Sequence, residues 1–163
     1  MAAHRYWRLW CYVGGTGSYA AMAEVEFRES LGGSNVISGG TPTASSSYSA
    51  SFVASKAVDG NATTSWLSNA TIPAWWQYDF GAGVEKDIIE VAMTPRYGTP
   101  QHHLTNFLLQ FSDDGTLWDS YDEWITTWPN ETQQVFNAAN ATGARNGFIV
   151  TTPAARWGNV DSR

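Results

Sequence analysis

The chain has few cysteines, few charged residues and no long apolar run. Its 163 residues include one cysteine, Cys11, and only 15% are charged, against about a quarter in an average soluble protein. A single cysteine excludes a disulfide within the chain, so packing must hold the fold, and a free thiol is typical of folding in a reducing cytosol. No segment approaches the roughly 20 apolar residues of a membrane span, and the first residues lack an export signal. We therefore expect neither membrane insertion nor export through such a signal.

Basic residues are also scarce. Nine Lys and Arg residues oppose fifteen Asp and Glu residues, which gives a net charge of -6 and an isoelectric point near 4.8. Proteins that bind nucleic acid need a basic patch to displace counterions, so we expect no nucleic-acid partner. The same balance disfavours binding to anionic lipid.

Aromatic residues, by contrast, are abundant, at 14% of the chain with nine tryptophans. Apolar residues also alternate with polar ones in four segments, at 7–13, 23–27, 89–93 and 107–111. Such alternation predicts half-buried strands with one face toward a core. Because Arg8, Glu90 and Gln110 lie between the apolar positions, we expect them to face solvent.

Glycine, serine, asparagine and proline cluster between these segments, and no stretch has helical periodicity. Asp114-Gly115 follows the 107–111 segment and predicts a two-residue hairpin turn, because both residues tolerate a positive φ. Short strands with turns at this spacing are typical of an all-β sandwich or barrel. A chain of 163 residues is long enough for one such domain with a real core.

The stretch from Gly39 to about Phe136 carries several motifs in a recognisable order. They are AVDGN at 57–61, TSW at 64–66, WWQYDFG at 75–81 and SDDGTLW at 112–118. On these motifs the chain resembles the discoidin, or coagulation factor V/VIII C-type, family. The resemblance implies an all-β, galactose-binding-like jelly-roll β-sandwich that acts as a binding module and not as an enzyme.

The usual closing strands of that family, an RYxR strand and an AExE strand, stand first here, as HRYWRLW at 4–10 and MAEVEFR at 22–28. The chain therefore resembles a circularly permuted discoidin domain, which the neighbouring termini of such sandwiches permit. We expect the sandwich to span 1–137, with permuted closing strands at 1–30 and the main body at 39–137. Residues 138–163, with a short strand around 148–151, form either a disordered tail or an attachment arm. A second interpretation stays open, in which 138–163 supply the closing strands and the N-terminal pair is an addition.

The resemblance also implies a metal site. In related galactose-binding-like modules the Asp-Gly-Asn loop binds a structural Ca²⁺ together with a Glu of the AExE strand. A hard cation of this kind takes roughly six to eight oxygen ligands, which a sharp loop can supply together. The alternative is an Asx-turn, in which each side chain only bonds the amide two residues on. Carried over residue by residue, the resemblance implicates Asp59, Asn61, Thr64 and Glu24.

Loops at one end of such jelly rolls bind their partners. In these loops aromatic rings can stack on sugars, while arginine and histidine can donate to hydroxyl groups. We expect Tyr48 and Trp128 to be exposed, and the adjacent histidines to point to opposite sides of an extended backbone, which disfavours a shared metal. We expect three other tryptophans to pack in the core, Trp66, Trp75 and Trp118. The candidate ligand-binding residues are Tyr48, Arg96, Tyr97, His102, His103, Trp124 and Trp128.

Patterns for catalysis are missing from the sequence. It has no nucleophile elbow, no Cys/His pairing at a recognisable spacing and no phosphate-binding loop, and Asp113 and Asp114 pair only in a turn. Two functions remain open: recognition of cell-surface glycans, and docking onto a larger assembly.

The opening YWRL and AEVEF segments resemble those of tailed-bacteriophage virion proteins. We therefore expect a virion surface protein of a tail fibre, tail tip or capsid, made in the host cytoplasm. Its partners would be other virion proteins or further copies of itself. The alternative is a carbohydrate-binding module of a bacterial cell-surface or secreted protein.

Overall fold

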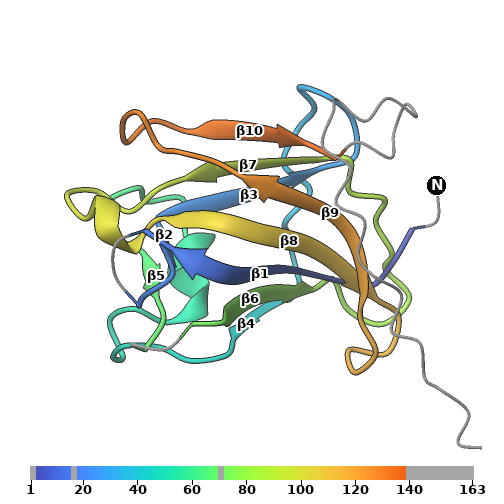
Figure 1. Cartoon of the computed structure of the whole chain (residues 1–163). Helices are drawn as coiled ribbons and strands as arrows, with labels where there is room; N and C mark the ends of the chain where they lie inside the picture. The colour runs from blue at the N-terminus through green and yellow to red at the C-terminus, as the bar shows by residue number, and fades with distance from the viewer. Residues whose placement is uncertain (1–2, 16–17, 70–71, 139–163) are drawn as a thin grey trace, which may run out of the picture.

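The structure, a computed structural model, describes residues 3–15, 18–69 and 72–138. Within these residues the chain forms ten β-strands and two short 3-10 helices and has no α-helix (Figure 1). The prediction of an all-β chain is confirmed. No helix of this part is long and apolar enough to cross a membrane. The predicted strand around 148–151 and the predicted tail or arm after Ala138 lie outside the described residues.

The larger sheet has five strands in the order β4-β6-β1-β8-β9, and every neighbouring pair is antiparallel. Their bounds are Thr41–Ala44 for β4, Ala74–Asp79 for β6, Tyr6–Gly14 for β1, Leu104–Ser112 for β8 and Asp119–Ile125 for β9.

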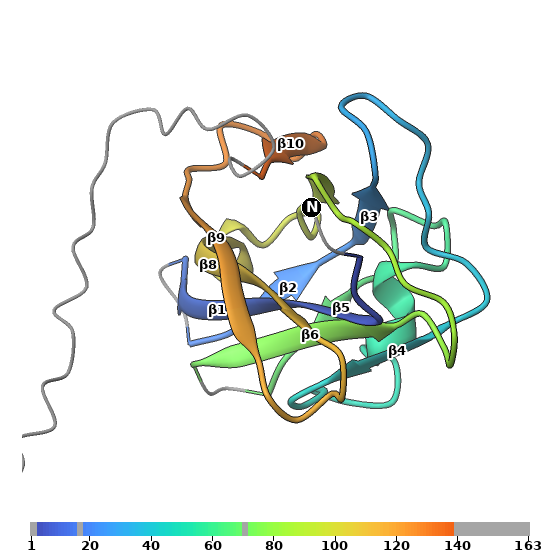
Figure 2. The same ribbon diagram turned by 90° about the vertical axis from the view of Figure 1, so that its right-hand side faces the viewer.

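A smaller sheet packs over the larger one in the order β10-β7-β3, and Figures 1 and 2 both show it above the larger sheet. The two short strands β2 and β5 form a separate antiparallel sheet. The bounds are Gln134–Asn137 for β10, Glu90–Thr94 for β7, Glu24–Arg28 for β3, Ala21–Met22 for β2, Trp66–Leu67 for β5, Ala54–Ala57 for η1 and Pro100–His102 for η2.

The first strand is an internal part of the larger sheet. It pairs with β6 through Trp10 and Trp75 and with β8 through Trp10 and Leu108. The third strand, β3, pairs with the middle strand of the smaller sheet, where Val25 lies opposite Met93. The two N-terminal segments therefore contribute one strand to each layer.

The core lies between the two sheets and follows the predicted alternation for most of its length. On β1, Trp7, Leu9 and Cys11 are fully buried. The alternation fails at Val13, which is 43% exposed, because a register shift between Cys11 and Val13 turns the strand end outward. Burial raises the pKa of the Cys11 thiol to about 12, so this cysteine is an inert core residue.

All three residues that were predicted to face solvent, Arg8, Glu90 and Gln110, are buried instead, and Arg8 is only 9% exposed. Glu90 is only 3% exposed because its carboxylate accepts hydrogen bonds from Arg28 Nη1 at 2.7 Å and from the Gly32 amide at 3.1 Å. Gln110 is 8% exposed because its amide oxygen accepts from Arg8 Nε at 2.7 Å on the outer face of the larger sheet. Each polar group is compensated by a charge-assisted hydrogen bond, which hydrophobic alternation does not reveal.

Two core positions are displaced by one residue from the prediction. Ile88 is fully buried instead of Ile89, and Trp76 is fully buried instead of Trp75. The Trp76 indole donates to the Ala54 carbonyl at 2.9 Å, whereas Trp75 is half-buried on the outer face of β6. In a strand, a shift of one residue moves a side chain to the opposite face, so the sequence motif placed the strand correctly and its orientation incorrectly.

The predicted β8–β9 hairpin is present, but its turn is longer than two residues. Residues 113–118 connect the strands, and within them only Gly115 has a positive φ, of 73°. Asp114 instead stabilises the turn through its Oδ1, which accepts the amides of Thr116 and Leu117 at 2.7 and 2.9 Å. These bonds hold the pKa of Asp114 well below its usual range.

Candidate functional site

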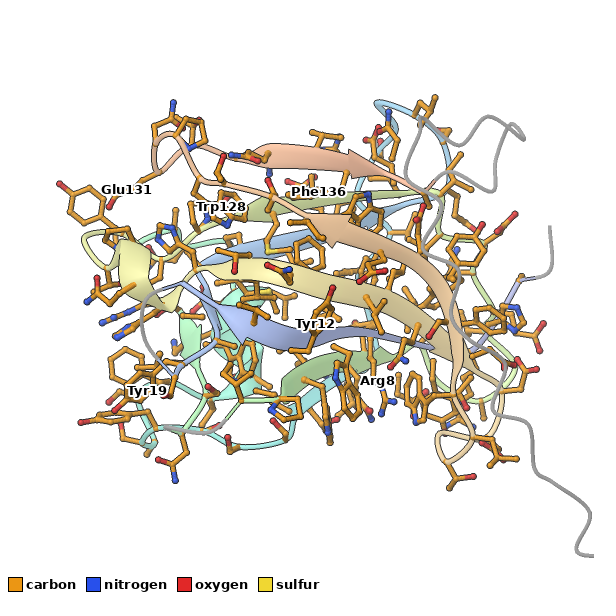
Figure 3. All side chains as sticks on the ribbon, in the orientation of Figure 1. Arg8, Tyr12, Tyr19, Trp128, Glu131 and Phe136 are labelled. Carbon is orange, nitrogen blue, oxygen red and sulfur yellow. The ribbon has the colours of Figure 1, made fainter. Side chains whose placement is uncertain are left out.

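One end of the sandwich gathers loops from five parts of the chain. They are the segments at 18–20, 45–53, 62–65, 95–103 and 126–133, and Figure 3 shows Tyr19, Trp128 and Glu131 at this end. Strands β1, β4, β7 and β9 of the two sheets lead into four of these loops. Such a scaffold can hold side chains of distant segments in fixed relative positions.

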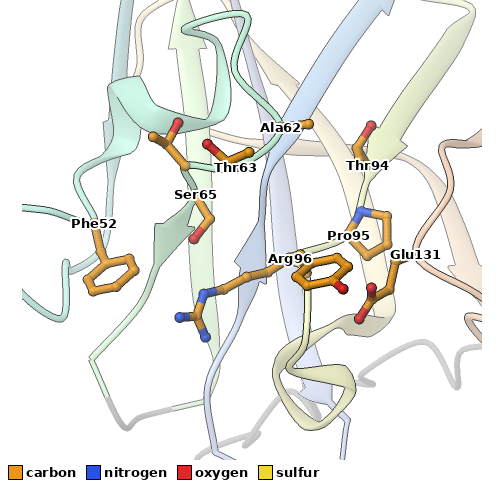
Figure 4. Close-up of a pocket in the computed structure, with 10 residues that line it drawn as sticks. Phe52, Ala62, Thr63, Ser65, Thr94, Pro95, Arg96 and Glu131 are labelled. Atoms are coloured by element: carbon orange, nitrogen blue, oxygen red, sulfur yellow. The ribbon is translucent and has the colours of Figure 1, made fainter.

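A pocket of about 550 Å³ opens at this end of the sandwich. Its walls come from Phe52, residues 62–65, residues 94–97 and Glu131 (Figure 4). This volume lies in the range of sites that hold small molecules or single sugar units. The pocket is therefore a candidate ligand site at this end of the domain.

Arg96 is the central polar group of this pocket. Its Nη1 donates to Thr99 Oγ1 at 3.0 Å and lies 3.2 Å from His102 Nδ1, and its guanidinium carbon lies 5.1 Å from the Phe52 ring centroid. Partial burial and then the nearby Arg96 charge lower the pKa of His102. No acidic side chain of the described residues forms an ion pair with Arg96. A cation held in place by neutral groups is available to a ligand.

Aromatic rings continue this surface beside Arg96. The ring centroid of Tyr19 lies 4.7 Å from that of His102 and 6.0 Å from that of Tyr48. The ring centroids of Tyr48 and Phe52 also lie 6.0 Å apart. Tyr48 is 55% exposed, as predicted for a ligand-facing residue. The sequence prediction missed Tyr19 and Phe52, although Phe52 stands in the same loop as the predicted residue Tyr48.

The predicted residue Tyr97 lies on the other side of the pocket. Its side chain is 77% exposed, and the next amide, of Gly98, donates to Glu131 Oε1 at 2.5 Å. This bond ties the 95–103 loop to the 126–133 loop. Glu131 thereby closes one wall of the pocket, a role that the sequence prediction did not assign.

Three predicted ligand residues lie inside the domain instead. His103 is 2% exposed, and its Nε2 bonds the Arg96 carbonyl at 2.8 Å. Trp128 is half-buried with its indole donating to the Leu104 carbonyl at 2.7 Å, so its predicted exposure is wrong. Trp124 packs against Phe107, with 5.4 Å between the two ring centroids. These three residues support the loops from beneath.

The predicted metal ligands lie together at the same end. The Glu24 carboxylate accepts the Asn61 amide at 2.8 Å, and Asp59 Oδ1 accepts the same amide at 3.1 Å. Thr64 Oγ1 donates to the Asp59 carboxylate at 2.9 Å. Gly60 has a φ of 74°, which lets the loop turn sharply between the two carboxylates.

The geometry of this loop is compatible with both interpretations from the sequence, an Asx-turn and a cation site. Asp59 and Asn61 each accept the amide two residues on, which is the Asx-turn pattern. At the same time the oxygens of Glu24, Asp59 and Thr64 converge from two segments, and this donor set fits a hard cation. Lys56 Nζ lies 2.9 Å from Asp59 Oδ2 and would have to move aside. The described residues contain no group of three or more His, Cys, Asp or Glu side chains with metal-site spacing.

The two carboxylates influence each other. Burial, together with the neighbouring Asp59 charge, raises the pKa of Glu24 to about 7, although the Asn61 amide opposes the shift. Burial also acts to raise the pKa of Asp59, but Lys56 and Thr64 hold that pKa below its usual value. Near neutral pH the Glu24 carboxyl is therefore partly protonated, and the proton reduces the repulsion between the Glu24 and Asp59 carboxylates that a bound cation would otherwise offset.

A family model of F5/8 type C domains matches residues 41–161. The chain belongs to the F5/8 type C domain family. No curated protein and no solved structure matches the chain. The match begins at β4, so the strands β1 to β3 precede it, and its last part extends beyond the described residues. Members of this family are generally non-enzymatic binding modules, and the antiparallel sheets have the galactose-binding-like β-sandwich fold of the family.

The Glu24 carboxyl makes the stability of this domain depend on pH. An unfolded glutamate releases its proton near pH 4.5 and the folded one near 7, so the folded state binds more protons between these values. In the absence of divalent cations, the free energy of unfolding should fall as the pH rises through this window. Glu24→Gln keeps the oxygen that accepts the Asn61 amide, so it should flatten the fall. Urea unfolding at several pH values measures this, and the exposed Glu85→Gln serves as control. An unchanged slope in Glu24→Gln would refute the assignment.

Proposed function

We propose that this F5/8 type C domain is a non-enzymatic module that binds a glycan at the pocket around Arg96. The observation that carries the proposal is the unpaired Arg96 guanidinium beside the half-exposed rings of Tyr48 and Phe52. Aromatic faces pack on the apolar side of a pyranose, while a guanidinium donates to its hydroxyl groups. The hydroxyls of Thr63 and Ser65 add further hydrogen-bonding groups to the wall.

Rigid loops favour such binding because little order must be gained when the sugar enters. Arg96 is already held by Thr99 and His102, and the Glu131 bond to Gly98 joins two loops. The sugar would replace water on Arg96 while the aromatic rings exclude water from its apolar face.

The test is a glycan array followed by calorimetric titration of a positive sugar. Arg96→Ala should weaken binding by about tenfold or more, since a hydrogen bond to a charged group contributes roughly 1.5–3 kcal/mol. Arg5→Ala is the matched control, because Arg5 pairs with Asp79 away from the pocket. A silent array, or equal affinity of Arg96→Ala and wild type, would remove the proposal. Trp128→Ala is a poor test because that indole is bonded to the Leu104 carbonyl beneath the loops.

We also propose that the loop of Asp59, Asn61 and Thr64, with Glu24, holds a structural Ca²⁺. Two carboxylates that share one amide donor, one with a raised pKa, support this assignment. Thr64 also lines the pocket, so a bound cation would stiffen one of its walls.

Calcium should therefore raise the melting temperature of chelator-treated protein. At a concentration a hundredfold above the dissociation constant the gain is about 2.7 kcal/mol. Glu24→Gln should lose most of this gain and the exposed Glu85→Gln should retain it. The assignment would be contradicted if calcium produced no heat in a calorimetric titration and no shift in melting temperature.

We further propose that the chain is a circularly permuted member of its family and a virion surface component of a tailed bacteriophage. The opening YWRL and AEVEF segments, which form β1 and β3 in the two layers, support the first part. Their resemblance to virion proteins and the unpaired Cys11 support the second. Residues 138–163 would then act as an attachment arm.

Two measurements test this placement. Mass spectrometry of purified particles should detect the chain among the virion proteins. Light scattering with size-exclusion chromatography should show an oligomer that a deletion of residues 138–163 reduces to monomers. A monomer unaffected by that deletion, with no peptide in purified particles, would instead favour a carbohydrate-binding module of a bacterial surface or secreted protein.

A further inference from the structure

A second unpaired arginine lies on the outer face of the larger sheet. Arg8 stands in the middle of β1, opposite Gln77 on β6 and Gln110 on β8. Its side chain and that of Tyr12 can be followed along β1 in Figure 3. Since alternate residues of a strand share a face, Trp10 lies on this face too, opposite Trp75 and Leu108.

Arg8 is enclosed by aromatic rings and not by acids. Its guanidinium carbon lies 4.0 Å from the Trp118 ring centroid and 4.7 Å from the Trp10 ring centroid, and the residue is 9% exposed. Its Nε donates to Gln110, whose amide donates in turn to Ser120 Oγ at 3.2 Å. Burial lowers the pKa of Arg8 to about 10, and no nearby acid opposes this.

Among the basic residues that the structure describes, the lack of an acidic partner sets Arg8 and Arg96 apart from the others. Arg5, Arg28, Lys56 and Lys86 all form ion pairs there, whereas Arg8 and the pocket residue Arg96 form none. Because the chain carries an excess of acids, an unpaired and nine-tenths buried cation is unexpected. The two terminal nitrogens of Arg8 have no hydrogen bond to a described residue, so a ligand anion can complete the site.

The surroundings of Arg8 select the kind of anion. Trp10, Trp75 and Trp118 are half-buried, so each offers part of a ring on this face. Flat apolar rings beside amide and hydroxyl groups suit a pyranose, and one planar guanidinium pairs best with one carboxylate. The net charge of -6 disfavours a dense polyanion, which the rest of the protein would repel.

We propose that the outer face of the larger sheet binds a carboxylated saccharide, with its carboxylate on Arg8 and its ring on Trp10 or Trp75. This site lies on the sheet face, whereas the pocket of Arg96 lies at the loop end. The two sites do not depend on each other, and either can exist without the other.

The experiment uses the full chain labelled with ¹⁵N, in which the indole signals of the tryptophans are assigned from single Trp→Phe variants. The probes are glucuronate, galacturonate and N-acetylneuraminate, each with its methyl ester as the uncharged match. The acids should shift the indole signals of Trp10 and Trp118. The esters should bind about tenfold more weakly or worse, because esterification removes the charge that Arg8 pairs with.

Variants separate this site from the pocket. Arg8→Gln should abolish the acid-dependent shift, Arg8→Lys should keep part of it, and Arg96→Ala should leave it unchanged. The melting temperature of each variant reports whether it folds. If Arg8→Gln does not fold, the comparison of acid with ester on the wild-type protein decides alone.

Three outcomes would overturn the proposal. They are the absence of any shift with all three acids at saturating concentration, equal shifts with acid and ester, and shifts that persist in Arg8→Gln. Shifts that vanish only in Arg96→Ala would place the acidic sugar in the loop-end pocket instead, which contradicts this proposal and supports the proposed function.

Discussion

The pairing of β1 on both of its edges is the constraint on which the rest of the domain depends. This strand joins β6 to β8, and without it the larger sheet would fall into separate pieces. Its inward residues, Trp7, Leu9 and Cys11, form the centre of the core. Its outward residues, Arg8 and Trp10, form the centre of the outer face. One strand therefore determines both packing and surface chemistry.

The path of the chain after β1 connects the core with the loop end. β1 ends at the loop end, and the chain returns through Ala21 and Met22, which pair with β5, before β3 begins at Glu24. The first residue of β3 thus lies against the loop of Asp59, where its carboxylate meets the Asn61 amide. Because β3 pairs with β7, the backbone of Glu24 is fixed beside the Asp59 loop, and the partial burial of its carboxyl follows from this strand pairing.

The sequence predicted the fold better than the site, and the reason is physical. Alternation of apolar residues located β1, β3 and β8, because burial on one face is a property of the strand itself. Alternation failed at Arg8 and Glu90, and the family motif gave the wrong orientation at Trp75, because the cover or the orientation of a strand depends on distant residues such as Ala54 and Arg28. A motif fixes where a strand runs, but not which neighbour covers its second face.

The same limit explains the uneven prediction of the site. Asp59 was identified through the family motif, and Arg96 and Tyr48 because they stand in loops at one end of such a jelly roll. Trp128 was wrongly predicted to be exposed, because a tryptophan in a loop can equally point inward, and here its indole nitrogen donates to the Leu104 carbonyl. Tyr19 was missed altogether. Periodicity does not apply in loops, so the direction of a side chain there is set by the tertiary partner it meets.

The two unpaired arginines share one physical design. Arg96 is held by Thr99, His102 and the Phe52 ring, and Arg8 by Gln110 and two tryptophan rings. Neutral acceptors and π-faces orient a guanidinium without neutralising it, whereas a carboxylate would occupy its hydrogen-bonding edge. Each cation is partly desolvated, so an incoming acceptor displaces little water and meets a fixed geometry. In an acidic chain that pairs its other described basic residues, this arrangement favours recognition over stability as the role of both side chains.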